Sequence, residues 1–307
     1  MNEARYRAAE SELWRSVDTT VTERRVRLTS TGTEVRIQIT GEGAPVVLLH
    51  GGPNAGSAWA PLVGRLKGFR CYIVDRPGTG LSDDYVMRQP RMLDIADHFV
   101  AQVLDGLEID RAHLVASSFG GFLAIRSAAV TPDRIDRMVQ MACPAFAPGM
   151  KIPKFMKSLR NGFLRWLIPR LPPHRPSSED IMRQLGHGAS LDAGRMSQDV
   201  DRWYAQLHRH TNTLKNDFAM IASALEGDPF DMSLALTPQI LGAVRTPTLF
   251  LWGTEDGFGG EDVARATVTA MPNAELEMCA GFGHLPWLDD ASLIAQRTGE
   301  FLSRPAP

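Results

Sequence analysis

Cysteine is scarce in this chain, and a long apolar run is missing. The three cysteines among the 307 residues, Cys71, Cys143 and Cys279, stand far apart and form no C-x-x-C pair. An odd and scattered set argues against a disulfide framework or a zinc site and is typical of a reducing compartment. No stretch of about 18 apolar residues occurs, so we expect no transmembrane helix.

An excess of charge of one sign and an export signal are also missing. The formal net charge is -2 at pH 7, which provides no overall attraction to nucleic acid or to membranes. The N-terminal stretch MNEARYRAAESELWRSV carries charges throughout and lacks the apolar run of a signal peptide. We therefore expect a cytoplasmic protein that binds no nucleic acid, and no residue pattern calls for a metal or a cofactor.

What the chain does have is a series of short apolar runs separated by helical patterns. The runs lack polar alternation, which is typical of strands buried on both faces of a parallel sheet. They lie at Pro45–His50, Cys71–Val74, His113–Ala116, Met138–Ala142, Thr248–Trp252 and Ala274–Cys279. Helices are expected between them, notably at Pro90–Leu107 and Gly121–Thr131. The alternation predicts an α/β fold with a doubly wound, mostly parallel sheet.

This alternation stops between residues 146 and 243, where several helical patterns but no convincing strand occur. We interpret the stretch as a helical cap (146–243) inserted into a sheet domain made of residues 1–145 and 244–307. Its first part carries seven Lys or Arg residues from Lys151 to Arg175 and no acid, interleaved with apolar residues. Such a pattern fits either the solvated face of a cap helix or a surface that meets anionic substrates or lipid interfaces.

A strand that runs straight into a helix carries the strongest chemical signal. In LVASSFGG (114–121) a hydroxyl stands at the turn, which is typical of a nucleophile elbow. The turn is so tight that the residues two before and two after the serine must be small. Ala116 and Gly120 meet this requirement for Ser118, whereas the residues flanking Ser117 are valine and phenylalanine. Ser118 is therefore the predicted nucleophile.

A serine nucleophile needs a base, and the base needs an anion that orients it. Of the eight histidines, His284 stands apart because its loop, GFGHLP (281–286), is glycine-rich and follows a late strand. The run TLFLWGTED (248–256) continues a buried strand into a glycine and two acids. Its spacing from the strand end favours Asp256 over Glu255. The resulting order Ser, Asp, His is that in which such sheets present a catalytic triad.

Acyl transfer also places negative charge on the former carbonyl oxygen, which backbone N–H groups stabilise. Phe119, directly after the predicted nucleophile, is one expected donor. The other is Gly52 in HGGPN (50–54), since Pro53 has no N–H. Cys143 and Trp287 complete the candidate set as predicted substrate-binding residues.

Taken together, these motifs resemble those of the α/β-hydrolase superfamily. The matching segments are HGGP (50–53), DRPGTGLS (75–82), SFGG (118–121), WGTED (252–256) and GH (283–284), and the resemblance covers about residues 35 to 303. It implies that Arg76 ties loops together at the border of the active site. The serine at the elbow is similar to that of esterases and C–C bond hydrolases, whereas dehalogenases and epoxide hydrolases carry an aspartate there.

The predicted function is that of a serine hydrolase that cleaves a carboxylic ester through an acyl-enzyme intermediate. In this hypothesis Ser118 attacks, His284 is the base, Asp256 orients it, and Gly52 and Phe119 hold the oxyanion. A C–C bond hydrolase with the same triad is the alternative enzyme. A small-molecule receptor of the same fold, with little turnover, is the alternative of another class. The expected partner is a small-molecule ester, and a homodimer is considered as the assembly.

Overall fold

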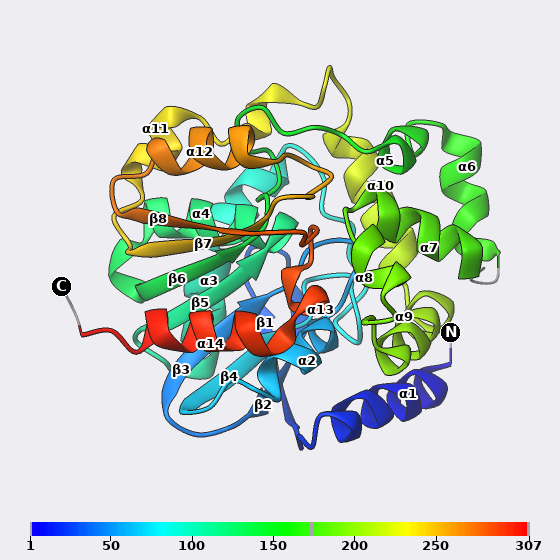
Figure 1. Cartoon of the computed structure of the whole chain (residues 1–307), viewed down its shortest axis with the longest axis horizontal. Coiled ribbons are helices and arrows are strands. Elements are labelled where there is room, and N and C mark those ends of the chain that lie inside the picture. The colour runs from blue at the N-terminus through cyan, green and yellow to red at the C-terminus, as the bar shows by residue number, and fades with distance from the viewer. Residues whose placement is uncertain (1, 172–174, 306–307) are drawn as a thin grey trace.

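The protein is built around one eight-stranded sheet (Figure 1). The computed structural model describes residues 2–171 and 175–305, and of residues 175–177 only the backbone. The strands are β1 (Thr22–Leu28), β2 (Thr33–Thr40), β3 (Ala44–Leu49), β4 (Phe69–Val74), β5 (Ala112–Ser117), β6 (Ile135–Met141), β7 (Thr248–Gly253) and β8 (Ala274–Cys279). Their order is β1-β2-β4-β3-β5-β6-β7-β8, with β2 antiparallel to both neighbours and all other pairs parallel. The predicted mostly parallel sheet is confirmed.

The sheet is buried on both faces, which explains why its central strands show no polar alternation. In β3, Val47 and Leu49 belong to one apolar cluster, whereas Val46 and Leu48 belong to the cluster on the opposite face. The first cluster includes side chains of α3 (Arg91–Leu107), α4 (Ser118–Val130) and α12 (Glu261–Thr269). The second includes side chains of α2 (Ala60–Val63), α13 (Pro286–Asp289) and α14 (Ala291–Leu302). Helices on both faces make the sheet doubly wound.

Between β6 and β7 the chain forms helices, and the described residues of 146–243 contain no strand. The helices are α5 (Lys154–Ser158), α6 (Gly162–Leu167), α7 (Arg175–Gln184), α8 (Gly188–Asp192), α9 (Gln198–His210), α10 (Thr213–Ala224) and α11 (Pro238–Ala243). Helices α5 to α10 lie together beside the sheet, whereas α11 lies over it and packs against α4 (Figure 1). We therefore propose that the cap ends before α11. Part of the predicted basic segment, residues 172–174, lies outside the described residues.

The N-terminal helix α1 (Glu3–Ser16) joins the sheet to the cap. It packs along α9, and the apolar side chains of both helices share one cluster. Glu10 of α1 is buried and accepts hydrogen bonds from Arg36 of β2, with Nη2 to Oε2 at 2.5 Å. Breaking a buried pair of this kind costs about 3–5 kcal/mol because the remaining charge is left without a partner. Helix α1 therefore holds α9 in place.

No helix within residues 2–171 and 175–305 is long and apolar enough to cross a membrane.

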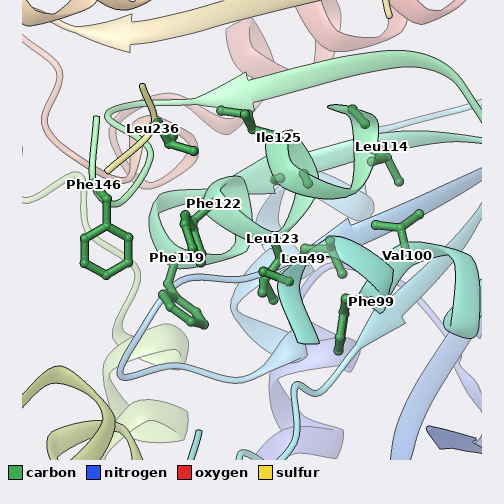
Figure 2. Close-up of a cluster of buried hydrophobic side chains, with 14 of the residues drawn as sticks. Leu49, Phe99, Val100, Leu114, Phe119, Phe122, Leu123, Ile125, Phe146 and Leu236 are labelled. Carbon is green, nitrogen blue, oxygen red and sulfur yellow. The ribbon is translucent and has the colours of Figure 1, made fainter. Parts of the chain in front are cut away.

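An aromatic cluster supports the start of α4 (Figure 2). Phe119 and Phe122 of this helix lie 5.6 Å apart between ring centroids, and Phe146, which follows β6, packs edge-on against Phe122 at 4.9 Å. Such arrangements contribute about 0.5–1.5 kcal/mol per pair beyond the area they bury. The sequence predicted that this helix begins at Gly121, but it begins at Ser118. The serine itself therefore occupies the first helical position.

Candidate active site

Ser118 lies at a sharp turn between β5 and α4, above the carboxyl edge of the sheet. Its φ is +52°, in the left-handed region that costs energy for a residue with a side chain. The small residue at 120 is required by space, because a Cβ on Gly120 would lie 2.1 Å from the carbonyl oxygen of Leu49. Helix α4 can therefore approach the end of β3 only with glycine there. This is the strained geometry of a nucleophile elbow.

His284 and Asp256 form a buried pair in the loops after β8 and β7. Nδ1 of His284 lies 2.9 Å from Oδ1 and 3.0 Å from Oδ2 of Asp256. The backbone N–H groups of Cys143 and Phe258 donate to the same carboxylate, each at 2.9 Å. The carboxylate thus fixes the tautomer in which Nδ1 carries the proton and Nε2 carries the lone pair. The competing acid, Glu255, is exposed and lies against Thr254.

His284 and Ser118 both line one cavity of about 400 Å³. Nε2 is buried, and within the described part of the chain it has no hydrogen-bond partner. It therefore makes no hydrogen bond to the hydroxyl of Ser118 in this conformation. Bonds of this kind often form fully only when substrate is bound.

The two predicted oxyanion donors, Gly52 and Phe119, line the same cavity. The loop that carries Gly52 approaches Ser118 closely, since a Cβ on the neighbouring Gly51 would lie only 2.7 Å from the Cβ of Ser118. Phe119 is in the first turn of α4, where backbone N–H groups have no partner within the helix. Their location fits oxyanion binding, and this role stays a prediction.

Arg76 ties this loop to the cap, whereas the resemblance implied only that it ties loops together. Its guanidinium donates to the carbonyl oxygens of His50 and Gly51, at 3.1 and 3.0 Å, and to Oδ2 of Asp217, at 2.8 Å. Asp217 belongs to α10 and is buried, as is Arg76. Burial raises the pKa of Asp217, and the charge and hydrogen bonds of Arg76 oppose that rise. The loop that carries Gly52 is therefore positioned by a cap residue.

A second buried pair, His187 with Asp289, holds the loop of the candidate base, and the sequence analysis missed it. Nδ1 of His187 lies 3.0 Å from Oδ1 of Asp289, and its Nε2 accepts the N–H of Leu285 at 3.1 Å. Asp289 also accepts the N–H of Gly283 at 2.9 Å. The N–H of His284 itself donates to the carbonyl oxygen of Leu185 at 2.9 Å. Three consecutive N–H groups around the base are thus bound by the cap and by Asp289.

Tyr204 and His208 of α9 add a polar pair to a cavity wall that is otherwise mostly apolar. The hydroxyl of Tyr204 donates to the carbonyl oxygen of Pro53 at 2.8 Å, and Nε2 of His208 lies 3.4 Å from the same oxygen. Burial lowers the pKa of His208 to about 4 and raises the pKa of Tyr204 above its usual value. Both side chains are therefore uncharged at neutral pH.

The two predicted substrate-binding residues lie in different places. Cys143 lines the cavity, and its backbone N–H donates a hydrogen bond to the carboxylate of Asp256. Trp287 does not line it, and the prediction for this residue is corrected. Its ring packs against that of Trp59 at a tilt, with centroids 4.1 Å apart, and its Nε1 donates to the carbonyl oxygen of Ala58 at 2.9 Å. The short helix α13 turns Trp287 into the apolar cluster under the sheet, away from His284.

Among residues 2–171 and 175–305, no group of three or more His, Cys, Asp or Glu side chains could hold a metal ion.

Comparison with known proteins identifies the family. A sequence profile described as the alpha/beta hydrolase fold matches residues 44–291, which span most of the chain. The chain belongs to the α/β-hydrolase fold family. Within this α/β-hydrolase the profile begins at β3 and ends at the start of α14, and therefore includes Ser118, Asp256 and His284.

Two relatives of this α/β-hydrolase illustrate its sequence similarity. It is 28% identical over 272 residues to a 2-hydroxy-6-oxo-6-phenylhexa-2,4-dienoate hydrolase from Burkholderia cepacia, covering 86% of this chain and 89% of the relative. It is 29% identical over 273 residues to a 2-hydroxy-6-oxononadienedioate/2-hydroxy-6-oxononatrienedioate hydrolase from Cupriavidus pinatubonensis, covering 84% and 86%.

Solved structures show the same fold. A carboxylesterase from Bacillus subtilis superposes with a TM-score of 0.72 at 19% identity, covering 98% of both chains. A 2-hydroxy-6-oxo-6-phenylhexa-2,4-dienoate hydrolase from a Rhodococcus species superposes with the same TM-score at 20% identity, covering 93% of this α/β-hydrolase and all of the other chain. Enzymes named for ester and for dienoate substrates thus share this architecture.

Proposed function

We propose that this protein is a serine hydrolase that cleaves an uncharged, largely apolar carboxylic ester. The observation that carries the proposal is that Ser118 and His284 line one cavity, while Asp256 binds Nδ1 of His284 and Nε2 has no hydrogen-bond partner among the described residues. A serine becomes an effective nucleophile only when a positioned base takes its proton. The His284–Asp256 pair and the shared cavity support these roles for the three residues.

The reaction proceeds in two steps. Oγ of Ser118 attacks the ester carbonyl as Nε2 of His284 takes its proton, and Asp256 stabilises the imidazolium. The N–H groups of Gly52 and Phe119 stabilise the oxyanion, each by about 3–4 kcal/mol. The alcohol leaves with the proton from His284, and an acyl group remains on Ser118. Water, activated by the same histidine, then adds to the acyl carbon, so that the acid departs and the serine is restored.

The cavity wall supports an uncharged substrate. Its described side chains include no Lys, Arg, Asp or Glu. Most of them are apolar, among them Phe155, Ile168, Phe218 and Ile221, and the polar pair Tyr204 and His208 is uncharged. A carboxylate buried without a cationic partner loses its hydration without compensation. An apolar acyl group therefore fits this wall better than an anionic one.

C–C bond hydrolysis is the second candidate, and the relatives favour it. Both relatives compared above are named as hydrolases of 2-hydroxy-6-oxo dienoates or dienedioates. The same serine and histidine could act on the ketone carbon of such a compound, with a carbon rather than an oxygen leaving. These names denote carboxylates, however, for which the described cavity wall offers no cation.

The two candidates predict different responses to substrate charge. We expect kcat/KM for p-nitrophenyl butyrate to exceed that for mono-p-nitrophenyl succinate, which has an acyl chain of equal length and a terminal carboxylate, by about 100-fold. Release of p-nitrophenolate by the purified protein measures both. A similar value for the two esters would contradict an uncharged substrate. Faster turnover of 2-hydroxy-6-oxo-6-phenylhexa-2,4-dienoate than of any ester would favour C–C cleavage instead.

We also predict that His187 positions the base without taking part in proton transfer. His187→Leu removes the acceptor of the Leu285 N–H, so kcat is expected to fall about 10- to 100-fold while KM changes little. His187→Gln keeps an acceptor and should restore part of kcat. Steady-state kinetics on p-nitrophenyl butyrate measure the effect, with His98→Leu as a control on the exposed face of α3. Equal loss of kcat in both His187 variants, in step with lowered thermal stability, would reduce His187 to a structural role.

A further inference from the structure

The outer edge of the cap carries a surface that the proposed reaction does not use. It comprises exposed cations and exposed large apolar side chains of residues 151–171, and we call it the cap-edge patch. Its members are Lys151, Lys154, Lys157, Arg160, Phe163, Trp166, Arg170 and Leu171. They lie on α5, on α6 and on the segments beside them, and α6 is at the edge of the cap farthest from the sheet (Figure 1).

The cations of the cap-edge patch are not neutralised. Three of the five lysines of the whole sequence lie at 151, 154 and 157, and residues 151–171 contain no Asp or Glu. Among the described ion pairs, none involves a cation of the patch. Arg160 instead donates to the carbonyl oxygens of Gly227 and Pro229, and Arg170 lies 4.5 Å over the ring of Trp166. The protein as a whole has a net charge of -2, so this positive charge is local.

Large apolar side chains are exposed between these cations. Phe163 is 64% exposed, Trp166 53% and Leu171 54%, and among the described residues only Val130 and Met232 are comparable elsewhere. The rings of Phe163 and Trp166 stack with centroids 6.1 Å apart. Exposed aromatic side chains next to Lys and Arg are typical of segments that lie in a membrane interface, where the rings enter the headgroup region and the cations meet anionic lipids.

The same segment forms part of the cavity wall on its inner side. Phe155, Met156 and Ile168 line the cavity, and Leu171 both lines it and is exposed in the patch. The patch and the cavity are therefore separated by a single layer of chain. A surface on which the patch rests would lie next to the apolar cavity.

We propose that the cap-edge patch docks on an anionic lipid bilayer, from which apolar esters reach the cavity. The absence of any acid in residues 151–171 favours an anionic partner over a second copy of this chain, whose own patch is also cationic. Docking does not depend on the proposed reaction, because no patch residue belongs to the triad. The supply of substrate from the bilayer does rest on the proposed function.

The test is co-sedimentation of the full chain with lipid vesicles. We expect binding to vesicles of phosphatidylcholine and phosphatidylglycerol at a ratio of about 2:1, little binding to pure phosphatidylcholine, and loss of binding as salt is raised. Lys154→Gln with Lys157→Gln should weaken binding about tenfold, and Phe163→Ser with Trp166→Ser should weaken it similarly. The matched controls, Lys67→Gln with Lys215→Gln and Met232→Ser, should bind as the unaltered protein does.

Several outcomes would overturn the proposal. Equal binding to both kinds of vesicle, no binding to either, or equal losses in the patch and control variants would each exclude docking through the patch. If light scattering shows a dimer that the patch substitutions dissociate, and no vesicles are bound, the patch is instead the interface with a second copy of the chain. Ser118→Ala should bind vesicles normally. If binding holds while no ester is turned over, the proposed function fails and the docking surface stands.

Discussion

Ser118→Ala is expected to lower kcat for p-nitrophenyl butyrate by about 10⁴-fold or more while leaving the protein folded. The hydroxyl is the attacking group in the proposed reaction, and enzymes of this kind that lack it retain only the contribution of oxyanion stabilisation and binding. The measurement is p-nitrophenolate release, together with labelling by a fluorophosphonate probe, which should be lost in parallel. Thermal unfolding should show an unchanged midpoint.

The neighbouring serine provides a matched control. Ser117 ends β5 and is buried, and its hydroxyl has no hydrogen-bond partner in the described chain. Removing an unpaired buried hydroxyl costs little stability, so Ser117→Ala should keep both activity and labelling. If Ser117→Ala abolished labelling and Ser118→Ala did not, the assignment of the nucleophile would be wrong. No labelling of the unaltered protein, with no ester turned over, would favour a receptor.

Asp256→Asn is the second substitution with a large expected effect, a loss of about 10⁴-fold in kcat. The introduced amide can donate to Nδ1 of His284, which would place the ring proton on Nε2 and leave no base toward Ser118. The carboxylate also accepts N–H groups from Cys143 and Phe258, each on a different oxygen, so the amide nitrogen of Asn removes one of these two acceptors as well. Kinetics measure the loss, and ¹⁵N chemical shifts of the His284 ring report the tautomer.

Glu255 is the control for this substitution, because it is adjacent in sequence and exposed. Glu255→Gln removes the same charge without touching the ring of His284 and should leave kcat within about twofold. A large loss in Glu255→Gln and a small one in Asp256→Asn would show that the acid had been misassigned. A lost kcat in Asp256→Asn without a changed tautomer would mean that the carboxylate acts by charge alone.

Local patterns predicted the sheet, which is confirmed, and indicated the candidate triad, because both depend on short-range constraints. A strand buried on both faces must be apolar at every position, as β3 shows with Val46 and Val47 on opposite sides. The elbow must have small residues around Ser118, since a Cβ on Gly120 would strike the carbonyl of Leu49. Such requirements are visible in any sequence that has the fold.

The prediction that Trp287 binds substrate was wrong because a residue near His284 in sequence can still point to a different side of the sheet. Helix α13 begins at Pro286, between His284 and Trp287. The turn of this helix places Trp287 against Trp59, where ring packing and burial stabilise it. The limit of the cap at residue 243 stays a prediction, and the packing of α11 against α4 is the basis for the earlier limit that we propose.

The sequence by itself determined the fold class and led to the candidate nucleophile, base and acid, because each rests on spacing within a few residues. Only the tertiary structure decided which distant side chains bind and position the loops that carry these residues. His187 and Asp289 are 102 residues apart and Arg76 and Asp217 are 141 apart, yet each pair joins the cap to a loop of the active site. A partner at that distance is selected by folding of the whole chain, because a buried polar group must find its hydrogen bond wherever the packing provides one.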